Sequence, residues 1–152
     1  MSIDVEKIKQ IREETGAGVM DVKQVLEEFN GDVEKAKAEL MKKGLAKAAK
    51  KSEREASDGL IFSYIHAGGK VGSMIHLACE TDFVAKTDDF QNLCKEIAMQ
   101  VCTEESQDVE DLLKAEYMRD SSKTISDLIA ETIAKLGENI ELRNAVRFSI
   151  RD

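Results

Sequence analysis

A pair of glycines between two strand-like runs constrains the fold more than any other feature of the chain. Residues 59–66 and 70–80 are rich in aliphatic, β-branched and aromatic side chains, and Gly68-Gly69 between them suits the positive φ angles of a two-residue turn. The sequence therefore predicts a β-hairpin over residues 59–80. The pairs expected on its strongly apolar face are Leu60–Leu77, Phe62–Ile75 and Tyr64–Ser73, with Val71 and Cys79 on the same side.

The opposite face of this hairpin is half apolar. Its side chains are expected to be Ile61, Ile65, Met74 and Ala78 among Ser63, Gly72 and His76. A sheet with apolar residues on both faces usually meets a second layer on each side. We therefore expect this face to have a partner as well.

The rest of residues 58–152 supplies helices and one more strand. Thr87 is a predicted N-cap for a helix over about 88–104, and a second amphipathic helix over 124–136 ends at Gly137. The segment 140–150 alternates like a strand. Its expected inward side chains are Ile140, Leu142, Val146, Phe148 and Ile150, with Asn144 breaking the pattern. This predicts an α+β domain: a small three-stranded antiparallel sheet packed with helices.

Residues 1–44 predict a separate three-helix module. Apolar residues recur every three or four positions in three short stretches, with "TGAG" and "NGD" between them. Asp32 is the expected N-cap of the third helix, and Gly44 its expected end. A bundle this small has only a marginal core of its own.

A basic helix over residues 45–57 is expected to connect the two parts. Between Lys42 and Arg54 there are five Lys and one Arg against one Glu, although the whole chain carries a net charge of −8. The segment is either a solvated connector or a docking surface for an acidic partner or phosphate. The overall acidity argues against general nucleic-acid binding.

Several function classes find no support in the residues. The apolar stretches are too short to span a bilayer. Cys79, Cys94 and Cys102 show no framework or metal spacing, and we expect reduced thiols in a cytoplasmic protein. His76 and Cys79 lie near Glu80 and Asp82 in sequence, but an odd spacing puts them on opposite strand faces. We expect a non-enzymatic binding protein without metal or cofactor.

The stretch "CETDFVAK" leaves one aromatic residue open to two interpretations. Phe83 follows the hairpin after the polar residues Glu80, Thr81 and Asp82. It is either a core anchor at the strand exit or a side chain displayed for a partner. The pattern alone does not decide between them.

Three stretches resemble the bacterial elongation factor Ts family in that family's order: "IREETGAGVMDVKQVLEEFNGDVEKAKAELMKKGLAKAAKK", "HLACETDFVAKTDDFQNL" and "IAKLGENIELR". The resemblance implies a guanine-nucleotide exchange factor for the GTPase elongation factor Tu, with a ubiquitin-associated-like N-terminal module. It implies that one run disturbs the partner's Mg²⁺ site: Thr81, Asp82, Phe83 and Val84. It also implies partner contacts at Val19, Met20, Lys23, Lys50 and Lys51.

Two further expectations follow from the resemblance. The chain is similar to the short family form with a single core subdomain, so the half-apolar sheet face lacks an internal partner, and we expect a homodimer through it. The alternative function is a ubiquitin-associated-like peptide-binding module on an α+β scaffold. Such a module gives no reason for a Thr-Asp-Phe-Val run.

Overall fold

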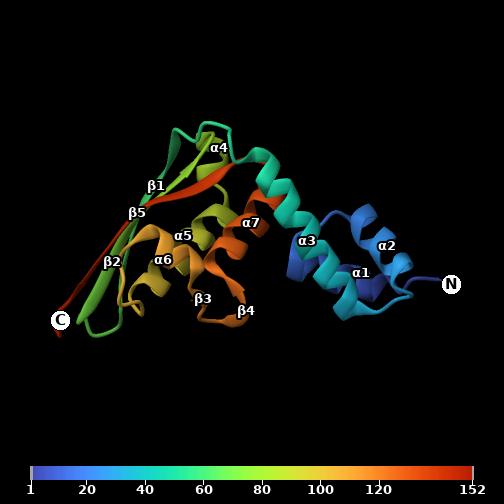
Figure 1. Cartoon of the computed structure of the whole chain (residues 1–152), viewed down its shortest axis with the longest axis horizontal. Coiled ribbons are helices and arrows are strands. Elements are labelled where there is room, and N and C mark those ends of the chain that lie inside the picture. Colours follow the sequence, from blue (N-terminus) through green and yellow to red (C-terminus); the bar gives the residue numbers. More distant parts are fainter. Residues whose placement is uncertain (1, 152) are drawn as a thin grey trace.

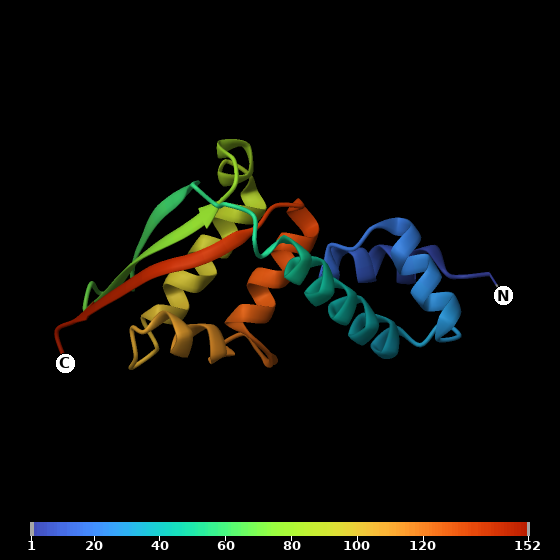
Figure 2. The same cartoon turned by 45° about the horizontal axis from the view of Figure 1, so that its top comes forward.

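The computed structural model describes residues 2–151. It shows an elongated molecule whose N-terminal and C-terminal segments lie at opposite ends of the long axis (Figures 1 and 2). Three N-terminal helices form one end, and a sheet covered by helices forms the other. The helices are α1 (Val5–Thr15), α2 (Val19–Glu28), α3 (Val33–Lys51), α4 (Asp82–Ala85), α5 (Asp88–Val101), α6 (Val109–Lys114) and α7 (Ile125–Leu136). The strands are β1 (Asp58–Ile65), β2 (Val71–Cys79), β3 (Glu116–Tyr117), β4 (Asp120–Thr124) and β5 (Ile140–Ser149).

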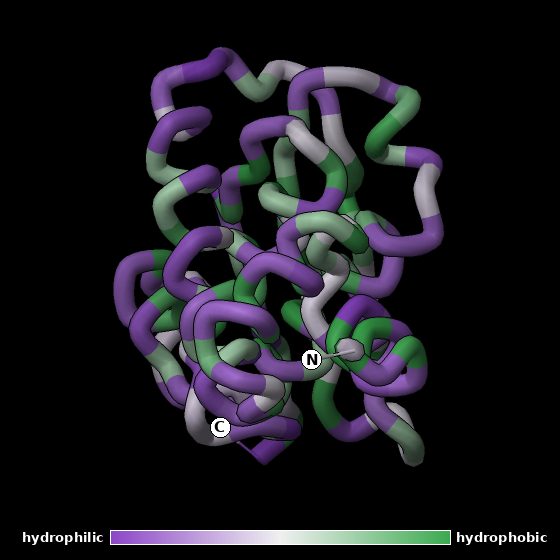
Figure 3. The backbone as a smooth tube through the Cα atoms, turned by 90° about the vertical axis from the view of Figure 1, so that its right-hand side faces the viewer, coloured by the Kyte–Doolittle hydropathy of each residue, from purple (hydrophilic) through white to green (hydrophobic). Residues whose placement is uncertain are grey.

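The N-terminal helices enclose a small apolar core of their own. The buried members are Ile11, Val22, Val25, Leu26, Ala36 and Leu40. Asp32 caps α3 as predicted, because its carboxylate accepts a hydrogen bond of 3.1 Å from the Lys35 amide. Seen along the long axis, hydrophilic and hydrophobic residues alternate along these helices (Figure 3), which is the pattern of amphipathic helices.

The prediction that Gly44 ends the third helix is wrong. α3 continues through Gly44 to Lys51, so the expected connecting helix is the second half of the same helix. A Cβ atom at Gly44 would lie 3.7 Å from the Ala134 Cβ atom of α7, which places the two helices in close contact. Four residues later, Ala48 is buried in the core of the second part. One helix thus belongs to both cores, and a domain boundary at residue 44 stays a prediction.

The hairpin forms in the predicted register. β1 and β2 are antiparallel, with Leu60 opposite Leu77 and Phe62 opposite Ile75. Both turn glycines have positive φ, 88° at Gly68 and 67° at Gly69, which explains why glycine occupies both positions. β5 pairs with the other edge of β2, giving a three-stranded sheet in the order β1-β2-β5.

The predicted faces of the third strand are right for its first half and wrong for its second. Ile140 and Leu142 are buried as expected, but Phe148 is 76% exposed and Ile150 is 69% exposed. The pairing jumps from Leu77–Leu142 to His76–Asn144, so Arg143 is an extra residue in a β-bulge. Because side chains alternate with a period of two, one extra residue turns Val146, Phe148 and Ile150 to the outer face.

In the part of the chain that the structure describes, helices cover the inner face of this sheet and leave its outer face open, and the fold class is α+β (Figures 1 and 2). α5 and α7 supply most of the helical side of the core. The buried residues of α5 include the predicted apolar stripe: Phe90, Leu93, Cys94, Ile97, Ala98 and Val101. Gly137 ends α7 with φ 80°, as predicted. The single-turn helix α4 and the short β3–β4 hairpin were not predicted.

Candidate partner-binding site

Phe83 is displayed, with 80% of its surface exposed. It lies in α4, one helical turn that follows β2 directly. Thr81 is the N-cap of this turn, and its hydroxyl accepts a hydrogen bond of 3.4 Å from the Val84 amide. The turn thus projects outward between two buried residues, Cys79 at the end of β2 and Val84 within α4 itself.

The two residues after Phe83 anchor the turn. Val84 is 9% exposed and Ala85 is 3% exposed, and both belong to the main core. The Thr87 hydroxyl donates a hydrogen bond of 2.7 Å to the Val84 carbonyl before it caps α5. Of the predicted Thr-Asp-Phe-Val run, Asp82 and Phe83 therefore face solvent, whereas Val84 holds the turn in the core. The role of the run at a partner stays a prediction.

A residue that the sequence analysis did not single out also contacts this turn. Glu138, in the connection between α7 and β5, accepts hydrogen bonds from Thr81. The two residues are 57 positions apart, so no local pattern reveals the contact. The one sequence signal is the helix end at Gly137, which places a polar turn immediately before a strand.

The residues predicted for a second contact lie at the other end of the molecule. Met20 is 74% exposed and Val19 is 46% exposed in the first turn of α2, and Lys23 is exposed one turn later. Lys50 and Lys51 end α3. Figures 1 and 2 both place α2 and α4 far apart, so a single partner that touches both must be large. The exposed apolar residues Val19 and Met20 on α2 and Phe83 on α4 therefore form two separate surface sites rather than one.

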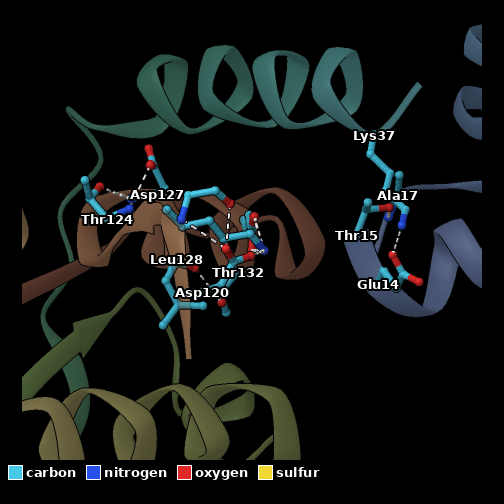
Figure 4. Close-up of polar contacts among 12 residues, drawn as sticks. Glu14, Thr15, Ala17, Lys37, Asp120, Thr124, Asp127, Leu128 and Thr132 are labelled. Carbon is cyan, nitrogen blue, oxygen red and sulfur yellow. Dashed lines mark hydrogen bonds and ion pairs between the residues drawn. The ribbon is translucent and has the colours of Figure 1, made fainter. Parts of the chain in front are cut away.

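A groove of about 490 Å³ lies elsewhere, between the N-terminal helices and α7. Several of its charged side chains are paired within the chain, among them Lys37 with Glu14, and Lys123 with Glu131 at 2.9 Å. Figure 4 shows Lys37 of α3 and Glu14 of α1 on one side of this region, and the capped start of α7 on the other. The Lys37 hydrogen bond lowers the pKa of Glu14, whereas burial raises the pKa of Glu131. We interpret the groove as the seam between the two parts of the fold.

The candidate reactive groups His76 and Cys79 do not come together in the structure. Cys79 is fully buried on the inner sheet face, while His76 lies on the opposite face, as predicted. Burial raises the pKa of Cys79 to about 11 and that of Cys94 to about 12, so both are protonated thiols at neutral pH. Within residues 2–151 no three His, Cys, Asp or Glu side chains gather as a metal site would require. In that same span, every helix is too short or too polar to cross a bilayer.

Comparison with known proteins gives the family. A family model described as elongation factor TS matches residues 80–152. Elongation factor Ts of Thermoanaerobacter sp. (strain X514) is 42% identical over 191 aligned positions, covering 96% of this chain and 94% of the relative. The protein of the same name from Coprothermobacter proteolyticus is 43% identical and covers 99% of both chains.

A longer relative matches equally well over part of its length. Elongation factor Ts of Nostoc sp. is 47% identical over 150 positions, which are 99% of this chain but 47% of the relative. The alignments with the two shorter relatives span 191 and 195 positions, more than the 152 residues here, so those relatives carry additional residues within the matched region. The extent and identity of these matches show that the chain belongs to the elongation factor Ts family.

Proposed function

We propose that this protein is a guanine-nucleotide exchange factor that speeds the release of GDP from elongation factor Tu. The observation that carries the proposal is the display of Phe83, a large aromatic side chain that is 80% exposed on a turn anchored in the core. Exposed aromatic residues on rigid supports are typical anchors of protein interfaces. Exchange forms and breaks no covalent bond, so no catalytic side chain is required.

In the proposed mechanism Phe83 inserts between helices of the GTPase and disturbs the supports of its Mg²⁺ ion. Mg²⁺ joins the nucleotide phosphates to the GTPase, so moving its supports weakens nucleotide binding. Thermodynamic linkage then requires bound nucleotide to weaken the binding of the factor by the same amount. Rebinding of GTP releases the factor, which can act again.

The size of the effect requires a second contact. Burying an aromatic side chain contributes about 1.5–3 kcal/mol, of which the 80% exposed at Phe83 is about 1.2–2.4 kcal/mol. A thousandfold faster release requires about 4 kcal/mol. We therefore assign the remainder to the exposed start of α2, at Val19, Met20 and Lys23.

Release of labelled GDP from elongation factor Tu tests this function. The parent protein should accelerate release, and Phe83→Ala should lose most of the acceleration while keeping its circular dichroism spectrum, because 80% of the residue is exposed and little of it packs in its own chain. Met118→Ala is a matched control, since Met118 is an exposed apolar residue (40%) in the turn between β3 and β4, two strands that Figure 1 places on the far side of the core from α4. No acceleration by the parent would refute the function.

We also propose that the protein forms a symmetric homodimer through the outer face of its sheet. This face carries five exposed apolar side chains: Ile61, Ile65, Met74, Phe148 and Ile150. Ala78, expected in the same patch, is only 1% exposed and is covered by the chain itself. The β-bulge adds Phe148 and Ile150 to this apolar face. The face therefore supports dimerisation more strongly than the residues of the hairpin do alone. Two such faces can bury each other in sheet-on-sheet packing.

A further inference from the structure

The carboxylate of Glu138 binds the backbone of the turn that displays Phe83. One oxygen accepts hydrogen bonds from the amides of Glu80, at 3.2 Å, and Thr81, at 2.9 Å. The other oxygen accepts a hydrogen bond of 2.7 Å from the Thr81 hydroxyl. Hydrogen bonds to an ionised acceptor are about twice as strong as neutral ones. Three of them therefore fix the chain at the point where β2 ends and α4 begins.

The orientation of Phe83 depends on this fixation. α4 has four residues, too few for a helix to be stable by itself. The Phe83 side chain is mostly in solvent, so little of it packs against the rest of the chain. The C-terminal side of the turn is held by the buried residues Val84 and Ala85. The N-terminal side of the turn is held by the hydrogen bonds between Glu138 and residues 80 and 81.

The next residue links the same turn to the helix that carries the N-terminal module. The Asn139 amide donates to the Glu80 carboxylate at 2.7 Å, and its side chain donates to the Arg54 carbonyl at 2.8 Å. Asn139 is 2% exposed, and Ser52, whose carbonyl it also reaches at 3.5 Å, is the C-cap of α3. The Phe83 turn and the end of α3 are thus joined through adjacent residues of one connection.

We propose that Glu138 is a positioning residue for nucleotide exchange: it holds the Phe83 turn in the place from which the aromatic ring reaches the partner. Asn139 fixes that place relative to α3, and hence relative to the contact on α2. This proposal rests on the proposed exchange function and adds to it a residue that touches neither nucleotide nor Mg²⁺.

The test compares Glu138→Ala with Glu138→Gln in GDP release from elongation factor Tu. Glu138→Ala should lower the rate at saturating factor by no more than Phe83→Ala does, roughly 8- to 60-fold, since a misplacement of about 1 Å is enough to remove the effect of the ring. The half-saturating concentration should change little, because the α2 contact is untouched. Glu138→Gln should keep most of the rate, because its amide oxygen still accepts from the backbone and its NH₂ group can donate to Thr81.

A double variant separates positioning from a general loss of stability. If Glu138 acts through Phe83, the variant Phe83→Ala/Glu138→Ala should release GDP no more slowly than Phe83→Ala alone. Losses that multiply would overturn the proposal, as would a parental rate in Glu138→Ala. If Glu138→Ala does not fold, Thr81→Val enters the same comparison: it removes the hydroxyl's bonds to Glu138 and to the Val84 amide and leaves the backbone bonds of Glu138 in place.

Amide hydrogen exchange provides a readout independent of activity. In Glu138→Ala the amides of Glu80 and Thr81 should exchange faster, while those of α5 stay protected. Unchanged protection at both amides would overturn the proposal. If the parent does not accelerate GDP release, the proposed function fails, and amide exchange still decides whether Glu138 holds the turn.

Discussion

Replacing Phe148 by serine should dissociate the proposed homodimer without harming the fold. Phe148 is 76% exposed on β5, so the single chain gains almost nothing from burying it. In a dimer with two-fold symmetry the same side chain is buried twice, once from each copy. The substitution therefore acts selectively on association.

The exposed fraction of Phe148 sets the size of the expected change in the Kd of the dimer. Full burial of an aromatic side chain contributes about 1.5–3 kcal/mol, so the exposed 76% of Phe148 is worth about 1.1–2.3 kcal/mol in each copy. Two copies lose about 2.3–4.6 kcal/mol. Since 1.4 kcal/mol is a factor of ten in an equilibrium constant, Kd should rise by about 50- to 2,000-fold.

Sedimentation equilibrium over a range of concentrations measures this shift. Val5→Ser is the matched control, because Val5 is 74% exposed on α1 at the opposite end of the molecule (Figure 1). The control should dimerise like the parent. A parent that remains monomeric at tens of micromolar, or a Phe148→Ser variant with the parental Kd, would refute the reasoning.

Three other outcomes follow from the structure. A thiol reagent at mildly alkaline pH should label Cys79 and Cys94 only as fast as the chain unfolds, because burial raises their pKa values to about 11 and 12; rapid labelling of the native protein contradicts this. Burial also raises the pKa of Glu131, so the folded chain binds that proton more tightly than the unfolded chain. As pH falls from neutral toward the ordinary glutamate pKa of 4.5, urea unfolding should show the parent gaining stability relative to Glu131→Gln. Finally, Gly44→Ala should raise the free energy of unfolding by about 0.5–1 kcal/mol, because Gly44 lies within helix α3. Gly137→Ala should lower the free energy of unfolding by about 1–2 kcal/mol, because Gly137 has a left-handed φ of 80°. Equal effects of the two substitutions would contradict these helical and left-handed conformations.

The hairpin could be predicted from the sequence down to its register. Two glycines at the turn leave one way to pair the flanking runs, and this pairing puts large apolar residues opposite one another. The third strand could be predicted only as far as Leu142. A prediction from alternation assumes an unbroken strand. The sole sign of the bulge in the sequence is the polar Asn144, at a position where the alternating pattern expects an apolar residue. Phe148 was therefore assigned to the core although it lies on the opposite face.

Tertiary contacts explain the other differences. Gly44 has the right local signature for a helix end, but close packing against Ala134 favours continuing the helix. In the candidate site, Phe83 could be identified from its polar neighbours and the family resemblance. Glu138 could not, since its contact with Thr81 joins segments 57 positions apart. Local patterns name the side chain on display but not the side chains that support it.

The extra residue at Arg143 has a consequence for how the sequence can change. Deleting this one codon would leave the composition nearly unaltered, yet Val146, Phe148 and Ile150 would turn inward and their neighbours outward. Point substitutions in the same strand alter one contact each, whereas this deletion exchanges an entire half-strand between interior and surface. Insertions and deletions in β5 should therefore be far more damaging than substitutions at the same positions.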